Sequence, residues 1–496
     1  MFLNKKPVKV HKVTVPIKEE KTPQKPRNGD PRRSSAATRT VSTPRPVQRP
    51  QHLLKESRDR FLSPQPSFTR LKRKSASPSV HFSSSSDESS ADEANGIGKR
   101  RKTEPVRSLE PDNDRDVRDT AEWMEDDVNK FQLLHGADLT ALNGSPKYKP
   151  AFVKEGADVV KVELQYPSKL PRERFDLLVP QEDEGYRPID DIVHTIDQIA
   201  QHYLPPSIRD PLTDDVTVFS RRFKRALNRN CAEEFTSTVD EFNTALTTAL
   251  VDGTVASVLK ITHTLPFPLI ERILAQVYSR TVSPAVELLR KYENGTNDVY
   301  GELLPRFTER LFRETHLKRD QVFVDLGSGV GNVVLQAALQ VGCESWGIEK
   351  NDNPCALADK QLAEFRTRCR LWGLAPGPAT LIQGDFLSSP TIDAAIRRAD
   401  VILVNNQAFN PELNDKLVMK FLDVKEGARI VSLKSFVPKG WQIKPRNVED
   451  PRNMLSVVRR EYFSDCVSWT NANGDYFIAT KDSAPLRRFQ KANGIR

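Results

Sequence analysis

The sequence predicts an α/β protein whose parallel sheet is covered by helices on both faces, preceded by a smaller, mainly helical domain and a disordered basic arm. Two features predict the sheet. From Gln321 onward, short runs of β-forming residues alternate with segments of helical period. The first run leads into an aspartate and three glycines within Gln321–Asn332, the pattern of a strand that feeds a helix over a ligand.

The first 130 residues are predicted to be a disordered basic arm. Residues 1–102 carry 24 Lys and Arg against 9 Asp and Glu, a net charge of +15, whereas the rest of the chain carries −6. The arm is rich in Pro and Ser and lacks apolar periodicity, so it cannot bury enough surface to offset the entropy of ordering. Its clusters Leu71–Lys74 and Lys99–Lys102 are typical of nuclear import signals and of nucleic-acid contacts, although such runs can also be merely solvated.

The arm ends in an acidic segment, Glu110–Asp127, where nine acids stand against two arginines. We expect a solvated linker here; folding back on the arm, or binding of a basic protein, are the alternatives.

Composition excludes several classes of protein. The five cysteines form no C-x-x-C pair and the eight histidines are scattered, so neither a disulfide framework nor a metal site is expected. No apolar run reaches the roughly 18 residues of a membrane span, and the first residues lack the apolar core of a signal peptide. We therefore expect a soluble intracellular protein that binds no metal and no membrane.

Residues 150–300 are predicted to form a β-hairpin and a helical subdomain. Apolar and polar residues alternate from Val160 to Tyr166 and again from Phe175 to Val179, on either side of a Pro-rich turn. The period then becomes helical in four segments. Their landmarks are a stripe from Ile189 to Tyr203, a stripe from Phe235 to Leu250, a start at Pro268, and a Ser283–Pro284 cap.

Residues 300–485 are predicted to form the catalytic domain, and residues 486–496 a polar tail. The expected strands are Gln321–Leu326, Glu344–Glu349, Ala379–Gln383, Asp400–Asn405, Ala428–Leu433 and a closing hairpin of Val457–Tyr462 with Tyr476–Ala479. Helices are expected at Val333–Leu339, at Asn353–Trp372 and from Pro411 to Phe421.

The spacing of the glycines favours one ligand over another. A dinucleotide fingerprint needs its third glycine at position 332, where Asn332 stands; the glycine is one place early, at Gly331, in a D-x-G-x-G-x-G pattern. This form favours S-adenosylmethionine, although a glycine loop alone is also compatible with a tight structural turn.

Acids at the ends of the next two strands support this ligand. Glu349 can accept hydrogen bonds from both ribose hydroxyls, and Asp385 can accept the adenine amino group while Phe386 covers the ring.

Five motifs then resemble a known family, the Dot-one (disruptor of telomeric silencing) histone lysine methyltransferases of fungal type. They are Val299–Phe307, Phe323–Ala338, Gly347–Asp352, Gly384–Leu387 and Val401–Asn414. The resemblance implies a class I S-adenosylmethionine-dependent methyltransferase with a Rossmann-like seven-stranded sheet. It implies methylation of a lysine in the globular core of histone three, in nucleosomes, without a SET domain.

The resemblance also implies roles for individual residues. Cofactor contacts are expected from Tyr300, Gly301, Glu302, Leu303, Asp325, Gly327, Ser328, Gly329, Val330, Gly331, Asn332, Glu349, Asp385 and Phe386. The catalytic residues are expected to be Asn405, beside the transferred methyl group, and Tyr300, with Trp469 and Tyr476 as the aromatic wall of a lysine channel. The latter two aromatics are compatible with a place in the core as well. Leu403 departs from the family, in which an aromatic can occupy this position.

The functional expectations follow from the family and from the arm. We expect a nuclear, monomeric enzyme of chromatin regulation, telomeric silencing and the DNA damage response, which binds nucleosomal DNA through its arm. Two alternatives stay open, a nucleic-acid methyltransferase and a chromatin-binding scaffold with a vestigial cofactor pocket.

Overall fold

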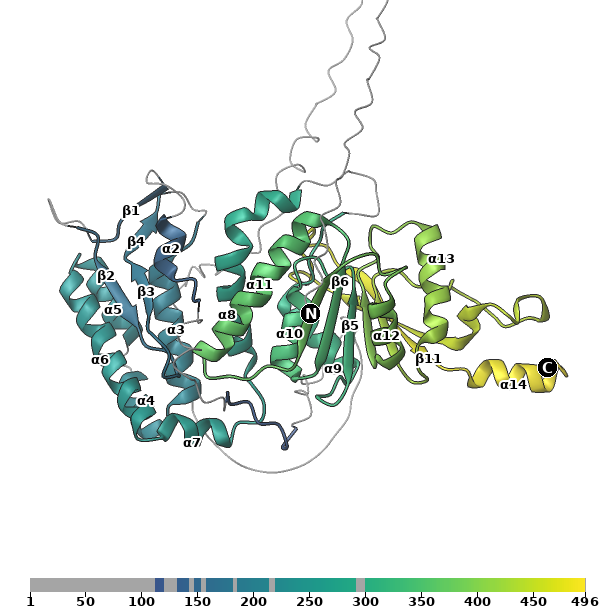
Figure 1. Ribbon diagram of the computed structural model, residues 1–496, viewed down its shortest axis with the longest axis horizontal. Helices are drawn as coiled ribbons and strands as arrows, with labels where there is room; N and C mark the ends of the chain where they lie inside the picture. Colours follow the sequence, from purple (N-terminus) through teal and green to yellow (C-terminus); the bar gives the residue numbers. More distant parts are fainter. Residues whose placement is uncertain are drawn as a thin grey trace, which may run out of the picture. The chain divides into compact units, whose positions relative to one another are not determined.

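The computed structural model, shown in Figure 1, describes most of the chain after residue 111. The described ranges are 112–119, 132–141, 147–152, 158–181, 185–213, 219–290 and 299–495. Of the predicted arm, residues 1–111 and 120–130 lie outside them, with both basic clusters, whereas residues 112–119 of its acidic end lie inside. None of the helices in these ranges is long and apolar enough to cross a membrane.

A seven-stranded sheet forms the centre of the catalytic part, in the order β10-β11-β9-β8-β5-β6-β7. The strands are β5 Val322–Leu326, β6 Glu344–Glu349, β7 Ala379–Gln383, β8 Val401–Val404, β9 Arg429–Ser432, β10 Leu455–Tyr462 and β11 Gly474–Lys481. Strands β5 to β9 are parallel, and β10 and β11 close the edge as an antiparallel hairpin. The order reverses at β5, between β6 and β8, which is where ligands bind in sheets of this kind. The predicted fold class and strands are confirmed.

Both faces of the sheet are buried at its centre. All five residues of β5 are buried, and alternate positions serve opposite faces: Phe323 and Leu403 pack in one core, Val324 and Ile402 in another. The helices that accompany the sheet are α9 Pro305–Glu314, α10 Asn332–Gln336 with its π-helical continuation η3 Ala337–Val341, α11 Asp352–Leu371, α12 Pro390–Arg398 and α13 Pro411–Lys420.

The preceding part contains the predicted hairpin, β2 (Lys161–Leu164) paired with β3 (Glu173–Asp176). A second small sheet pairs β1 (Tyr148–Pro150) with β4 (Leu178–Pro180). The helices are α2 Gly136–Ala141, α3 Pro188–Tyr203, α4 Pro206–Thr213, α5 Phe219–Asn228, α6 Ala232–Val251, α7 Thr254–Lys260 and α8 Phe267–Thr281, followed by the 3-10 helix η2 Ser283–Arg290. The apolar stripes predicted for α3 and α6 are mostly buried, and α8 begins one residue before Pro268, where a helix start was predicted.

Two expectations at the ends of the body differ from the structure. The segment expected to be a solvated linker is bound to the catalytic part at residues 112–119: Val117 is buried, and Arg115 donates to the carbonyls of Leu339 and Gln340 at 2.6 Å each. The apolar and arginine side chains among the acids provide these contacts. At the other end, the predicted tail is helical, because α14 spans Ala484–Ala492.

Candidate active site

A cavity of about 550 Å³ lies at the carboxyl ends of β5, β6, β7 and β8, a volume typical of nucleotide-sized ligands. The predicted site residues that line it are Tyr300, Gly301, Glu302, Leu303, Asp325, Gly327, Ser328, Gly329, Val330, Asn332, Glu349, Asp385, Phe386 and Asn405. The cavity lining does not include Gly331, Trp469 or Tyr476. The structure therefore brings together residues from five separate motifs.

The glycine loop between β5 and α10 requires glycine for two reasons. Gly329 and Gly331 have φ values of 55° and 90°, in the left-handed region. A Cβ atom at Gly329 would stand 2.8 Å from the ring of Tyr300, and one at Gly331 would stand 2.5 Å from Leu381. The loop therefore passes directly beneath the Tyr300 ring.

The carboxylate of Glu349 at the end of β6 holds this loop. Its Oε2 accepts a hydrogen bond from the backbone N–H of Gly329 at 3.0 Å, and its Oε1 accepts from those of Lys350 and Asn351 at 2.9 Å each. Asp325, at the preceding strand, is buried. Burial, and then the charge of Glu349, raise the pKa of Asp325 well above its ordinary value.

The carboxylate of Glu302 is held by two tyrosines. The hydroxyl of Tyr300 donates to its Oε1 at 2.5 Å, and the hydroxyl of Tyr278, from α8, donates to the same oxygen at 3.1 Å. Burial raises the pKa of Glu302, while hydrogen bonds from Tyr300, Tyr278 and Asn332 oppose that shift. Sequence reasoning missed Tyr278, since nothing in a helical stripe indicates that one member reaches another subdomain.

The side-chain amide of Asn405 has a hydrogen-bond partner at its nitrogen but none at its oxygen among the described residues. Its Nδ2 donates to the carbonyl oxygen of Gly301 at 3.0 Å, which fixes the orientation of the amide, because a carbonyl oxygen cannot accept from Oδ1. Its Oδ1 is buried and has no hydrogen-bond partner among the described residues. A buried acceptor in this state is available to a donor from a ligand or from water.

Two aromatic rings stand near the predicted adenine end. Phe386 and Phe409 have ring centroids 6.1 Å apart, and Asp385 accepts from the backbone N–H of Leu387 at 2.8 Å. Phe409 comes from the loop between β8 and α13 and had no assigned role in the sequence, although its motif was recognised.

The two aromatics expected in the channel wall behave differently. Trp469 packs against Gly301, where a Cβ atom would stand 2.7 Å from its ring, next to but not in the cavity lining. Tyr476 is fully buried: its hydroxyl donates to Glu314 at 2.6 Å and its ring packs against Phe307. The structure does not bring Tyr476 to the cavity, and the alternative of a core residue applies to it.

The ionisable groups around the cavity are mostly carboxyl groups. Glu302, Asp325, Glu349 and Asp385 line it, and Lys350 is the single cation among the described lining residues. This set favours a ligand with positive charge, which would also compensate for the burial that raises the pKa values of Asp325 and Glu302. Among the described residues there is no group of three or more His, Cys, Asp and Glu side chains that could hold a metal ion.

Comparisons with known proteins identify the family. The model of the family "Histone methylation protein DOT1" matches residues 278–481. A relative from Aspergillus fumigatus is 48% identical over 92% of this chain and 93% of its own, and one from Gibberella zeae is 42% identical over 84% and 87%. Both are named histone-lysine N-methyltransferase, H3 lysine-79 specific.

Among solved structures, an O-methyltransferase from Bacillus cereus in complex with SAH is 14% identical over 42% of this chain and 90% of its own, at a TM-score of 0.26. This likeness is too low to carry a conclusion. The family assignment depends on the relatives, which match nearly the whole chain, and on the methyltransferase sheet with its glycine loop. We conclude that this chain belongs to the DOT1 family of histone methylation proteins and is an S-adenosylmethionine-dependent methyltransferase.

Proposed function

We propose that the protein transfers methyl groups from S-adenosylmethionine to lysine 79 of histone H3 in the nucleosome. The observation that carries the proposal is Asn405, whose amide is fixed by Gly301 while its Oδ1 lacks a partner in an acidic, nucleotide-sized cavity. The names of the relatives supply the histone and the lysine. Nuclear localisation, telomeric silencing and a part in the DNA damage response belong to the same proposal.

The residues present fit S-adenosylmethionine. Glu349, already oriented by three backbone N–H groups, would accept from the ribose hydroxyls, and Asp385 with Phe386 would hold the adenine. Glu302 and Tyr300 would face the positively charged methionine end. When bound, S-adenosylmethionine supplies a methyl group on a positively charged sulfur.

The target lysine must lose its proton before it can accept a methyl group. A free lysine with a pKa of about 10.4 is neutral about once in 2,500 molecules at pH 7, a cost on the order of 4.6 kcal/mol. No histidine is among the described residues that line the cavity. We propose that apolar walls such as Leu303 and Leu403 disfavour the ammonium, so that the proton leaves to water. Asn405 then orients the neutral amine.

Substitution of Asn405 tests this positional role. Asn405→Asp would place a carboxylate beside the amine and raise the pKa of the lysine, so the rise of activity with pH should move to higher pH. Asn405→Ala should reduce the rate by about a hundredfold through misplacement, without that displacement. Full activity of Asn405→Asp with an unchanged pH profile would show that the residue does not orient the amine.

The proposed function is tested by radiolabelled methyl transfer with four acceptors side by side. They are whole nucleosomes, nucleosomes in which lysine 79 of histone H3 is replaced by arginine, free histones and naked DNA. Label should enter histone H3 of the unmodified nucleosomes and be absent when lysine 79 is replaced. Equal labelling of both nucleosomes would contradict the site, and labelling of DNA would favour a nucleic-acid enzyme.

The sequence after β8 argues against the nucleic-acid alternative. Enzymes that methylate base amino groups commonly have an N-P-P-Y type motif after this strand, whereas here Asn405 is followed by Asn406. The Asn406 amide is fully buried: its Oδ1 accepts from the N–H groups of Leu433 and Lys434, and its Nδ2 donates to the carbonyl of Lys434. It ties β8 to the end of β9.

The scaffold alternative is tested by calorimetric titration with S-adenosylmethionine. A chromatin-binding scaffold with a vestigial pocket would not bind the cofactor, whereas a methyltransferase should bind it.

The basic arm is proposed to bind nucleosomal DNA, and the enzyme to act as a monomer. The support is the charge split, since the arm carries a large positive charge and the body a small negative one. Deletion of residues 1–105 should weaken nucleosome binding and flatten its dependence on salt concentration. An unchanged salt slope would contradict the role of the arm.

A further inference from the structure

Helix α8 of the helical subdomain presents different residues on two opposite sides. Successive helical residues are rotated by about 100°, so Tyr278 lies about 180° from the direction shared by Gln276 and Arg280. Gln276 and Arg280 are buried in a polar cluster of the subdomain, whereas Tyr278 reaches Glu302 in the cofactor cavity. The orientation of α8 therefore determines where the Tyr278 hydroxyl lies.

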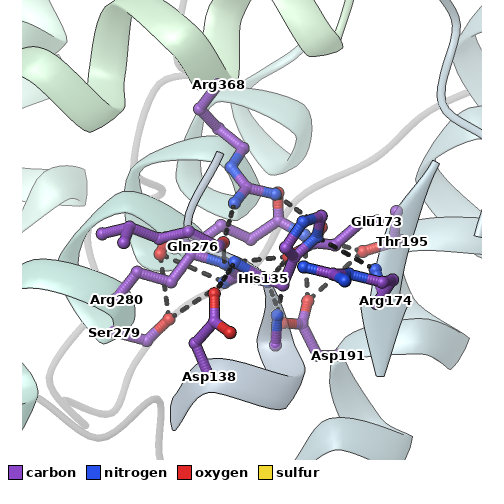
Figure 2. Close-up of polar contacts among 12 residues, drawn as sticks. His135, Asp138, Glu173, Arg174, Asp191, Thr195, Gln276, Ser279, Arg280 and Arg368 are labelled. Atoms are coloured by element: carbon purple, nitrogen blue, oxygen red, sulfur yellow. Dashed lines mark hydrogen bonds and ion pairs between the residues drawn. The ribbon is translucent and has the colours of Figure 1, made fainter. Parts of the chain in front are cut away.

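The polar cluster holds α8 in place (Figure 2). Arg280 donates from Nη2 to Glu173 of β3 at 2.6 Å and to Asp191 of α3 at 2.7 Å. Arg368 of α11 donates to the other oxygen of Glu173 at 2.5 Å. Gln276 donates to Asp191 at 2.9 Å and accepts from the indole N–H of Trp372. We call Glu173, Asp191, Gln276, Arg280 and Arg368 the buried ion cluster; it joins β3, α3 and α11 to α8.

On the opposite side, the Glu302 carboxylate has donors but no counter-charge. It is 8% exposed, and its side-chain partners are Tyr278 of α8, Tyr300 of its own loop and Asn332 of α10. No cationic side chain of the described residues faces it. Its backbone N–H is occupied by Ser468 Oγ. A carboxylate in such a place is charged only to the extent that hydrogen bonds or a cationic ligand compensate for its burial.

We propose that Tyr278 is a positioning residue of the cofactor site, which orients the Glu302 carboxylate toward the positively charged end of S-adenosylmethionine. The inference rests on the role of Glu302 in the function proposed above, and it adds a residue of the helical subdomain to the site. Tyr278 is not among the residues that line the cavity. Its effect passes through Glu302.

The inference is tested by calorimetric binding of S-adenosylmethionine between pH 6 and pH 8. Tyr278→Phe keeps the ring and removes one donor to Glu302, so binding should weaken about tenfold at neutral pH. The loss should grow as the pH falls, because the less compensated carboxylate takes up a proton more readily. Tyr203→Phe is the matched control: it removes another buried tyrosine hydroxyl between the two subdomains, one that donates to the carbonyl of Trp372 at 2.9 Å, away from the cavity.

A double variant tests whether the effect of Tyr278 passes through Glu302. In a Glu302→Gln background, which should bind weakly and without this pH dependence, the added Tyr278→Phe change should cost nothing further. Unchanged affinity and pH profile in Tyr278→Phe alone, equal weakening in Tyr203→Phe, or full additivity with Glu302→Gln would each overturn the inference. Failure of the unsubstituted protein to bind S-adenosylmethionine at any pH would instead refute the proposed function.

Discussion

Removal of one carboxylate from the buried ion cluster should be among the most destabilising single changes in this protein. Glu173 has no exposed side-chain surface and accepts five hydrogen bonds. The donors are Arg280 twice, Arg368, the hydroxyl of Tyr166 and the backbone N–H of Gly136. Glu173→Gln removes the charge between two buried guanidinium groups and turns an amide donor toward other donors.

The size of this destabilisation depends on the ion pairs that remain after Glu173 loses its charge. Breaking a buried ion pair by removal of one partner costs about 3 to 5 kcal/mol, because the other charge stays buried without compensation. Here Arg280 keeps Asp191 at 2.7 Å, and Arg368 keeps Glu364 at 2.6 Å. The remaining charges are therefore partly compensated, and we expect a loss at the lower end, about 3 kcal/mol.

Urea unfolding followed by circular dichroism measures this loss. Glu241→Gln is a suitable control, because Glu241 pairs with Arg222 at the surface with 53% of its side chain exposed, and such pairs contribute about 0 to 1 kcal/mol. The variants should unfold with equal slopes and different midpoints. If Glu173→Gln lowered the free energy of unfolding by no more than the surface control does, the reasoning that the cluster excludes water and that its ion pairs depend on one another would be refuted.

Three further changes test other contacts. Arg115→Ala should lower the free energy of unfolding by about 2 kcal/mol, since two buried carbonyls lose their donors, and thermal unfolding measures this. Gly329→Ala should weaken calorimetric binding of S-adenosylmethionine at least tenfold with the fold retained, because φ is 55° and the added Cβ meets a ring at 2.8 Å. Ion pairing holds the pKa values of Glu173 and Asp191 below their ordinary 4.5 and 3.8. Their stabilisation should therefore be complete above about pH 5, begin to decline near pH 4 and fall further toward the lower folded-state values, so the free energy of unfolding in urea titrations should decrease from pH 7 to pH 4 and again to about pH 3.

The strands and the glycine loop were predictable because their signals are local. Each strand of the sheet is a short apolar run between breakers, and Asp325, Glu349 and Asp385 stand directly after or at the end of such runs. Parallel strands present their carboxyl ends at one edge, so residues distant in sequence had to meet there. The cavity around these three acids follows from that rule.

The buried charges were not predictable, because no local pattern in the sequence indicates them. Glu173, Asp191, Arg280 and Arg368 have apolar or polar neighbours in sequence like those of any surface residue, and charged residues are almost always solvated. The ion pairs among these four residues join positions that are 89 to 195 residues apart in the chain. The burial of Tyr476 was not predictable for a different reason. This residue shares the face of β11 with Ile478, which packs in the core against α9, and motif resemblance says nothing about which face of a strand a residue takes.

The predicted domain boundary near residue 300 marks a change in the hydrophobic periodicity of the sequence. It does not separate two hydrophobic cores. Leu335 and Leu339 after the glycine loop, and Phe365 and Trp372 of α11, pack in the same apolar core as the hairpin and helices α3, α6 and α8. Arg368, on the same helix, is compensated by Glu173 of the hairpin. The helix that begins beside Glu349 is thus packed along its length against the helical subdomain. The N-cap residue of α11, Asn351, lines the cofactor cavity, and the helix packs against residues before 300. The helical subdomain therefore supports that site, and cofactor affinity should respond to changes placed far outside the cavity.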